Sequence, residues 1–152
     1  MGYGDVFEQL EAERVRYVVV SGVAVTLHGY RRPTLDLDLA VDPKPHEARR
    51  ATAALAALGF VPTIPLPLEL LTVLTMLDRG GRSLDLFARL LVPFEELWAD
   101  SALMSDGGGL VRVCSLEHLI RMKRLRNRPF DVLDVEGLLA AVRARGDTGT
   151  DG

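Results

Sequence analysis

Two aspartates in the first third of the chain have the residue type and spacing of a divalent-metal site. Asp36 and Asp38 lie in the alternating run TLDLDLAV at residues 34–41. Such alternation is typical of a strand with one buried face, so both carboxylates are predicted on the other face, roughly 7 Å apart at Cα. Like charges placed together repel, and a cation such as Mg²⁺ would remove the repulsion. A solvated strand face is the simpler interpretation of this pair taken alone.

The residues in front of the pair add a second feature. An apolar run at residues 17–20 ends at Ser21-Gly22, and a short apolar segment continues to His28 and Gly29. The segment from Gly22 to Gly29 is predicted to be a helix that ends at its glycine. Free N–H groups at its beginning would favour an anion, so the turn is a candidate phosphate site beside the aspartates. We interpret His28 as structural, since a metal-dependent site already has its electrophile.

This stretch resembles the signature of the polymerase-β-type nucleotidyltransferase superfamily. It is more closely similar to the small AbiEii-like nucleotidyltransferases of toxin–antitoxin and phage-defence systems, which have a G-G-x-A turn, an H-G, an R-x-T and a D-x-D. The matching residues here are Ser21-Gly22-Val23-Ala24, His28-Gly29, Arg32-Pro33-Thr34 and Asp36-Leu37-Asp38. Ser21 replaces the first glycine of the family turn, and a serine resists a positive φ and places a Cβ near the ligand.

The resemblance covers residues 16–143 and implies a fold. That fold is α/β (α+β), with a mixed sheet of about four or five strands and helices packed largely on one face. One nucleotidyltransferase-like domain is expected over residues 1–145, in keeping with a length of 152 residues. The polar, glycine-rich tail at residues 146–152 is expected to be disordered.

The resemblance also implies an activity, the transfer of a nucleoside monophosphate from an NTP to an acceptor hydroxyl with Mg²⁺ or Mn²⁺ as cofactor. Asp36, Asp38 and Asp85 would be the catalytic and metal-binding residues, and Asp85 would also activate the acceptor hydroxyl. Asp85 is flanked by Leu84 and Leu86 on a predicted strand, where a lone carboxylate is costly unless it is exposed or partnered. The residues implied to bind the nucleotide are Ser21, Gly22, Arg32, Thr34 and Lys123.

Basic residues concentrate at positions 121–128, which read RMKRLRNR. A solvated helix face is the usual explanation of such a run. AbiEii-like proteins resemble this segment in having a helical Lys followed by an Arg-Pro-x-Asp turn, matched here by Lys123 and residues 128–131. The resemblance implies that Lys123 faces the triphosphate and that the arginines follow an RNA acceptor. Asp131 and Asp134 are predicted to cap and brace the last helix, which is expected to end near Arg143.

Three functions are compatible with these features. The acceptor of a nucleotidyltransferase could be a tRNA or other RNA end, a protein hydroxyl or a small molecule, and the sequence does not choose among them. A catalytically silent member would instead act as a binding partner in a toxin–antitoxin pair, beside a cognate antitoxin or another partner protein. RNA binding without chemistry, through the basic segment, would weaken steeply with salt.

Composition limits the classes further. A hydrophobic fraction of 48% and a charged fraction of 26% are those of a soluble globular protein, and no apolar run is long enough to span a membrane. The beginning of the chain has no signal-peptide pattern, so a cytoplasmic location is expected. The net charge of −3 gives no global attraction to nucleic acid. The single cysteine, Cys114, lies in an apolar strand and is interpreted as a core residue.

Patterns elsewhere predict the remaining elements. Helices are expected at residues 5–14, 46–58 and 94–99. A further helix is expected to begin after Ser115, which would be its N-cap. Strands are expected at residues 16–20, 59–64 and 110–114, and a β-hairpin is expected from arms at residues 68–77 and 83–88. We interpret Asp42 as a turn or cap residue and Trp98 as a core residue.

Overall fold

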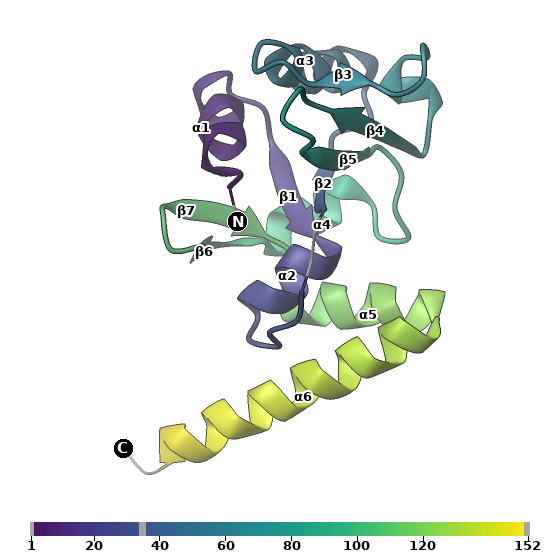
Figure 1. Cartoon of the computed structure of the whole chain (residues 1–152). Coiled ribbons are helices and arrows are strands. Elements are labelled where there is room, and N and C mark those ends of the chain that lie inside the picture. Colours follow the sequence, from purple (N-terminus) through teal and green to yellow (C-terminus); the bar gives the residue numbers. More distant parts are fainter. Residues whose placement is uncertain (1, 34–35, 151–152) are drawn as a thin grey trace.

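A seven-stranded mixed sheet forms the centre of the molecule in the computed structural model, which describes residues 2–33 and 36–150 (Figure 1). The sheet order is β3-β4-β5-β2-β1-β7-β6. β2 pairs antiparallel with β1 and parallel with β5, and β1 pairs parallel with β7. The strands are β1 (Tyr17–Val20), β2 (Leu37–Val41), β3 (Val61–Pro62), β4 (Val73–Leu77), β5 (Ser83–Phe87), β6 (Ala102–Ser105) and β7 (Leu110–Val113).

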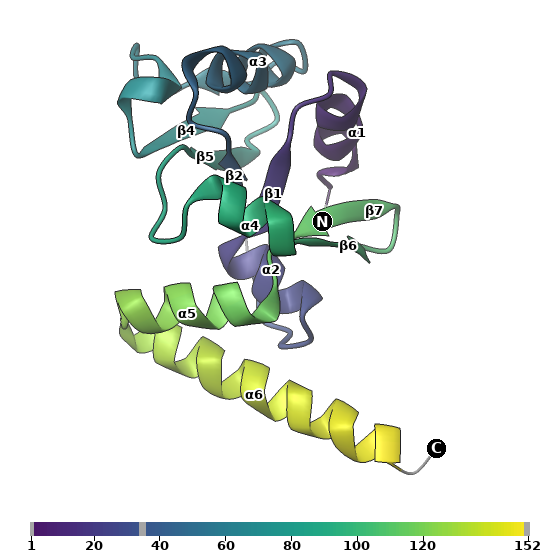
Figure 2. The same ribbon diagram turned by 180° about the vertical axis from the view of Figure 1, so that it is seen from behind.

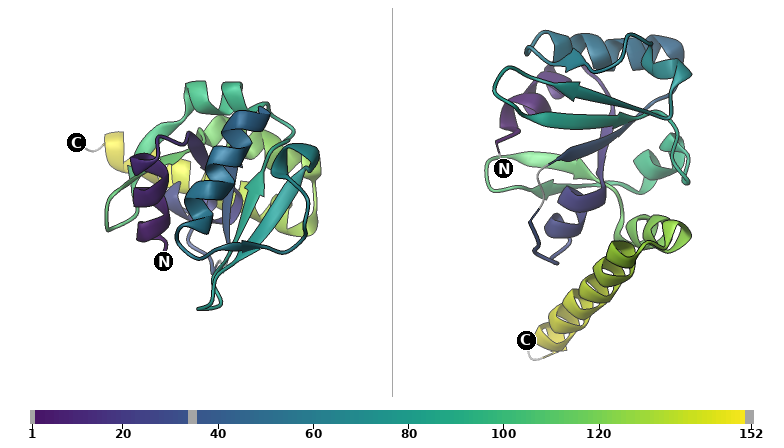
Figure 3. Two further views of the ribbon diagram at one scale, coloured as in Figure 1. Left: turned by 90° about the horizontal axis from the view of Figure 1, so that it is seen from above. Right: turned by 45° about the vertical axis from the view of Figure 1, so that its right-hand side comes forward.

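The helices lie in groups around this sheet. Figures 1 and 2 show α1 and α3 together at one end of the molecule and α5 with α6 at the opposite end, an arrangement that is also visible in Figure 3. Among the described residues, none of the helices combines the length and the apolar content of a transmembrane span. The helices are α1 (Gly4–Ala12), α2 (Ser21–Leu27), α3 (Pro45–Ala56), the 3₁₀ turn η1 (Leu68–Leu70), α4 (Phe94–Asp100), α5 (Leu116–Arg126) and α6 (Pro129–Thr150).

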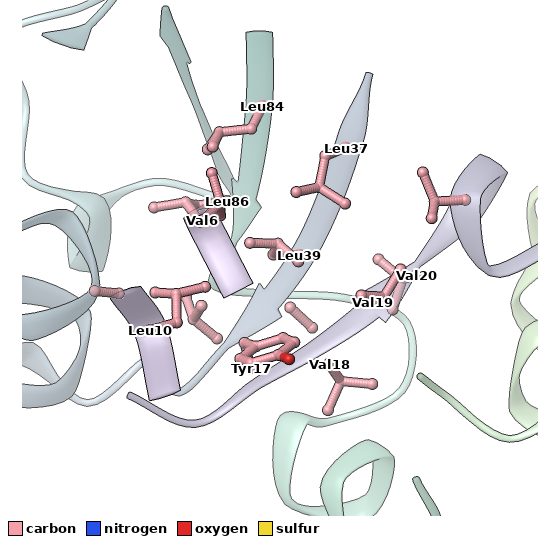
Figure 4. Packing of buried hydrophobic residues seen from close by; sticks show 14 of the residues in the cluster. Val6, Leu10, Tyr17, Val18, Val19, Val20, Leu37, Leu39, Leu84 and Leu86 are labelled. Atoms are coloured by element: carbon pink, nitrogen blue, oxygen red, sulfur yellow. The ribbon is translucent and has the colours of Figure 1, made fainter. Parts of the chain in front are cut away.

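The alternation in β2 sorts its side chains as the sequence predicts. Leu37 and Leu39 are completely buried, whereas Asp38 between them is partly exposed. Figure 4 shows Leu39 in a cluster with Val6 and Leu10 of α1, next to β5. Burying each such side chain stabilises the fold by about 1.5–3 kcal/mol. The apolar face of β2 is therefore fixed against α1, and Asp38 must face the other way.

The sheet has seven strands, so the expected count of four or five is wrong. The strand expected at residues 59–64 is present as β3, with two residues, and the strand that the sequence did not predict is β6, which has no buried residue and pairs with β7. β6 has no apolar alternation that would predict a strand, and its pairing with β7 holds it in the sheet. The predicted hairpin arm at residues 68–77 is also shorter than expected, since Leu68 to Leu70 form a 3₁₀ turn after Pro67.

The last helix is longer than the sequence pattern predicts. α6 runs from Pro129 to Thr150 and passes Arg143, where its end was expected. The disorder expected for the polar, glycine-rich residues 146–152 stays a prediction. One glycine costs a helix only about 1 kcal/mol relative to alanine, too little by itself to end a helix. Gly146 is such a glycine and lies inside α6. Residues 151–152 lie outside the described part of the chain.

Gly137→Ala is expected to destabilise the protein, although alanine is the better helix former. A Cβ on Gly137 would lie 2.3 Å from Cδ1 and 2.4 Å from Cγ of Tyr30, whose ring packs on α6. Overpacking of this kind costs about 1–3 kcal/mol, more than the helix propensity gained. Urea unfolding should show the loss, while the control Gly146→Ala, in open space on the same helix, should be neutral or more stable. Equal stability of the two variants would contradict this packing.

Candidate active site

The sheet brings Asp38 and Asp85 together. They are direct register partners on the parallel strands β2 and β5. Both point to the face opposite the buried leucines, and Thr75 of the neighbouring β4 donates its hydroxyl hydrogen to Asp85 Oδ1 over 2.5 Å. Three adjacent, hydrogen-bonded strands thus fix the positions of the two carboxylates.

The environment of Asp38 disfavours its charge. Burial raises the pKa of this carboxyl to about 6, and the nearby charge of Asp85 acts in the same direction. A hydrogen bond with Ser21 opposes the increase. A carboxylate whose negative charge is unfavourable beside a second carboxylate is a suitable ligand for a cation, because the cation would lower both costs.

Asp36 lies just before β2 and is exposed. Its charge also raises the pKa of Asp38, so the two groups interact electrostatically. Within residues 2–33 and 36–150, no three acidic, histidine or cysteine side chains are grouped closely enough to hold a metal ion by themselves. Asp38 with Asp85 still fits Mg²⁺, which binds to one or two carboxylates and takes further oxygens from water and substrate phosphates.

The predicted phosphate turn lies directly beside these carboxylates. Val20 at the end of β1 pairs with Asp38, and Ser21 then begins α2. Ser21 has φ of +61°, a conformation that favours glycine, and Gly22 is buried behind it. Ser21 lowers the pKa of Asp38 by hydrogen bonding, so a carboxylate lies beside this serine at the turn where a phosphate was expected.

Arg32 and Lys123, both predicted to bind phosphate, share one acidic partner in the structure. Arg32 donates through Nε and a terminal nitrogen to the two carboxylate oxygens of Asp134, over 2.7 and 3.0 Å. Lys123 Nζ lies 3.0 Å from Asp134 and 3.4 Å from Asp131. Both aspartates are 1% exposed. This network ties the loop before β2 to α5 and α6, and Thr34, the remaining predicted nucleotide ligand, lies outside the described residues.

The basic segment is less available than its sequence indicates. Arg126 binds both oxygens of Asp131 over 2.7 and 3.0 Å, and this pairing holds the pKa of Asp131 well below its usual range. Arg121 contacts Glu96 at 3.0 Å. The predicted role of Asp131 at the beginning of the last helix is confirmed, because it accepts a hydrogen bond from the Arg128 backbone N–H.

A groove of about 600 Å³ opens beside the turn at Ser21. Its walls come from β1 and α2, from the end of β5 and the residues after it, and from α5. Most of the lining is apolar, and arginines lie among the apolar side chains. The sequence did not predict a role in the site for several of these lining residues, among them Phe87, Arg89, Leu90, Leu91, Leu119 and Met122. Phe87 follows Asp85 by two residues on the same strand face, so the groove continues from the carboxylate pair.

Other residues have the structural roles predicted for them. His28 Nε2 lies 2.7 Å from the Cys114 carbonyl oxygen, and Cys114 is fully buried, which raises its thiol pKa to about 12. Asp42 accepts hydrogen bonds from the Lys44 N–H and from Arg16. Ser115 caps α5 by accepting from the backbone N–H of His118.

No model of a known protein family matches the chain, and no curated protein matches its sequence. Solved structures do match. The lincosamide antibiotic adenylyltransferase LnuA with lincomycin bound has a TM-score of 0.68 at 12% identity, covering 90% of this chain and 94% of that one. A Thermotoga maritima protein proposed to be a nucleotidyltransferase has a TM-score of 0.64 at 15% identity, covering 90% and 89%.

A third similar structure is ANT(2")-Ia in complex with adenylyl-2"-tobramycin. Its TM-score is 0.64 at 16% identity, and the match covers 93% of this chain and 87% of the other. At identities this low, the similarity shows a shared backbone arrangement and does not extend to the roles of individual side chains. The agreement extends over nearly the whole length of each of the three chains, and this protein therefore has the nucleotidyltransferase fold.

Proposed function

We propose that this protein transfers a nucleoside monophosphate from an NTP to an acceptor hydroxyl. The observation that supports this most directly is the register pairing of Asp38 with Asp85 on neighbouring strands, beside the turn at Ser21. On this fold, such a pair fits Mg²⁺ or Mn²⁺, with Asp36 near enough to join through water or phosphate oxygens. A bound divalent ion would neutralise negative charge on the transferring phosphate and on the leaving pyrophosphate.

The side chains of this chain would then have separate tasks. Asp85 would accept the proton of the acceptor hydroxyl while the oxygen of that hydroxyl attacks the α-phosphorus. The bond between the α-phosphorus and the oxygen that bridges it to the β-phosphate breaks, and pyrophosphate leaves. The groove beside Ser21 would hold the nucleoside and keep water from the reacting phosphorus. Arg128 lines the same groove, is exposed and would be a cation for a phosphate or its leaving group. Arg89 also lines the groove, but its terminal nitrogens donate to the carbonyl oxygens of Leu71 and Glu69.

The finer identity of the protein is part of the proposal. The resemblance to AbiEii-like proteins favours a cytoplasmic component of a toxin–antitoxin or defence system, with an RNA or protein acceptor. Of the structures with a similar fold, the lincosamide antibiotic adenylyltransferase LnuA has lincomycin bound, and ANT(2")-Ia is in complex with adenylyl-2"-tobramycin. A small-molecule acceptor is therefore the third class to be tested.

A catalytically silent binding partner is the second candidate, and one observation favours it. Arg32 and Lys123, the cations implied to hold phosphates, are both bound to Asp134. Ser21 also lacks the conformational freedom of the glycine that the family has at this position. A silent partner would keep this fold and its stability without binding nucleotides in a magnesium-dependent way.

Thermal unfolding with and without Mg²⁺ and each of ATP, CTP, GTP and UTP distinguishes the two candidates. A nucleotide at about 100 times its dissociation constant adds roughly 2.7 kcal/mol, which is several degrees for a domain of this size. The shift should require Mg²⁺, disappear in Asp38→Asn and persist in Glu8→Gln, an exposed carboxylate on α1. In Asp85→Asn, binding should survive better than transfer. Absence of a shift with all four nucleotides would support the silent partner.

A further inference from the structure

α6 has one covered side and one open side. Its covered side carries Asp131, Asp134, Val135 and Leu138, all buried against the rest of the protein. Figures 1 and 2 show α6 as the outermost element at its end of the molecule, with α5 on one side of it only. On the opposite side Leu133, Glu136, Ala140 and Arg143 are exposed to solvent.

The open side is not the polar surface that a helix normally presents to water. Among the residues whose exposure is described, the open side carries the apolar Val132, Leu133, Ala140 and Val142 beside Glu136 and Arg143, and apolar side chains on a helix are normally buried by another element. Leu133 is 52% exposed and Val132 is 44% exposed. The spacing of three, four and three residues places Leu133, Glu136, Ala140 and Arg143 in one row, which we name the outer stripe.

The charges of the outer stripe are self-complementary. Glu136 and Arg143 are exposed, have opposite signs and lie seven residues apart. They are symmetric about a point between Leu139 and Ala140. If two copies of α6 cross antiparallel at that point, each Glu136 faces the other copy's Arg143, and small or apolar residues meet between them. A parallel arrangement would place Glu136 against Glu136 and Arg143 against Arg143.

We propose that a second copy of this chain packs on the outer stripe, antiparallel and about a twofold axis. Such an isologous contact uses the same patch on both partners, which is the commonest symmetry of small oligomers. The contact involves a single helix from each copy, so the buried area is at the low end for specific interfaces and the association depends on protein concentration. This pairing leaves the groove beside Ser21 open, since the groove is lined by other elements.

Sedimentation velocity of the full chain over a wide range of concentrations tests the dimer. The wild type should shift from monomer to dimer as concentration rises. Glu136→Arg should remain monomeric, and so should Arg143→Glu, because each places like charges opposite one another in the antiparallel pair. An equimolar mixture of these two variants should associate again, since every facing pair then has opposite signs. Glu8→Arg is the matched control and should behave as wild type.

Circular dichroism of each variant should show an unchanged fold, because the substituted side chains are exposed. A wild type that stays monomeric at all concentrations overturns the proposal. A dimer that tolerates Glu136→Arg, or a mixture that fails to associate, also overturns it, because the contact would then lie elsewhere or have another orientation.

Discussion

Asp38→Asn is expected to make the ligand-free protein more stable at pH 8 while removing its magnesium-dependent nucleotide binding. Burial and the charge of Asp85 raise the pKa of the Asp38 carboxyl from 3.8 to about 6. The folded protein therefore binds this proton more tightly than the unfolded chain does, and ionisation opposes folding. The cost is absent below pH 3.8, grows as the pH rises and is complete above pH 6, where it amounts to roughly 2–3 kcal/mol. Asparagine does not ionise and avoids it.

Urea unfolding of wild type and Asp38→Asn at several pH values measures this difference. The advantage of the variant should be largest at pH 7–8, decrease between pH 6 and 3.8, and vanish below that. Other titrating groups are shared by the two proteins and cancel in the comparison. A variant that is less stable than wild type at pH 8 would show that Asp38 is held by interactions that favour its charge. A stabilising loss of function is typical of residues kept for a ligand.

Asp134→Ala is expected to lower the free energy of unfolding by about 3–5 kcal/mol, the cost of breaking a buried ion pair on one side. Asp134 is 1% exposed and is contacted by Arg32 at 2.7 Å and by Lys123 at 3.0 Å. Lys123 is almost completely buried, so its ammonium would remain in the interior, and Asp131 at 3.4 Å would be its remaining carboxylate partner among the described residues. The loop before β2 would also lose the contact that Arg32 makes with α6.

Asp5→Ala is the matched control for this substitution. Asp5 likewise receives two hydrogen bonds from one guanidinium, that of Arg82, over 2.7 and 2.9 Å. Its side chain is 47% exposed, and pairs of this kind contribute about 1 kcal/mol or less. The double variant Lys123→Met/Asp134→Ala should lose less stability than Asp134→Ala alone, because no ammonium is then left without its main partner. Equal losses of unfolding free energy in Asp5→Ala and Asp134→Ala would contradict the conclusion that burial makes the ion pairs of Asp134 costly to break.

The local parts of the fold were predictable from the sequence. Alternation in residues 35–41 was sufficient to assign Leu37 and Leu39 to the core and Asp38 to the opposite face, because the period of a strand fixes its two faces. Gly29, with φ of +111°, follows α2 as a terminating glycine should. Such features depend on neighbours within a few residues, and the sequence contains all of them.

The partners of the charged residues were not predictable in the same way. Arg32 and Lys123 were interpreted as phosphate ligands, and no local pattern indicates that Asp134, 102 residues after Arg32, takes both. The choice between a substrate and an internal carboxylate depends on how α5 and α6 dock. The groove was also missed, since its walls come from segments far apart in sequence and no single segment has a distinctive composition.

The pairing of β2 with β5 has a consequence for how the site could be divided or transplanted. Parallel strands cannot be joined by a tight turn, and here α3, β3 and β4 intervene between Asp38 and its register partner Asp85. A peptide or fragment that contains the 17–42 stretch, from the turn at Ser21 to the D-x-D motif, would still have only half of the carboxylate pair. Grafting this chemistry onto another scaffold would require transferring two neighbouring strands in register, and the motif alone would be inert.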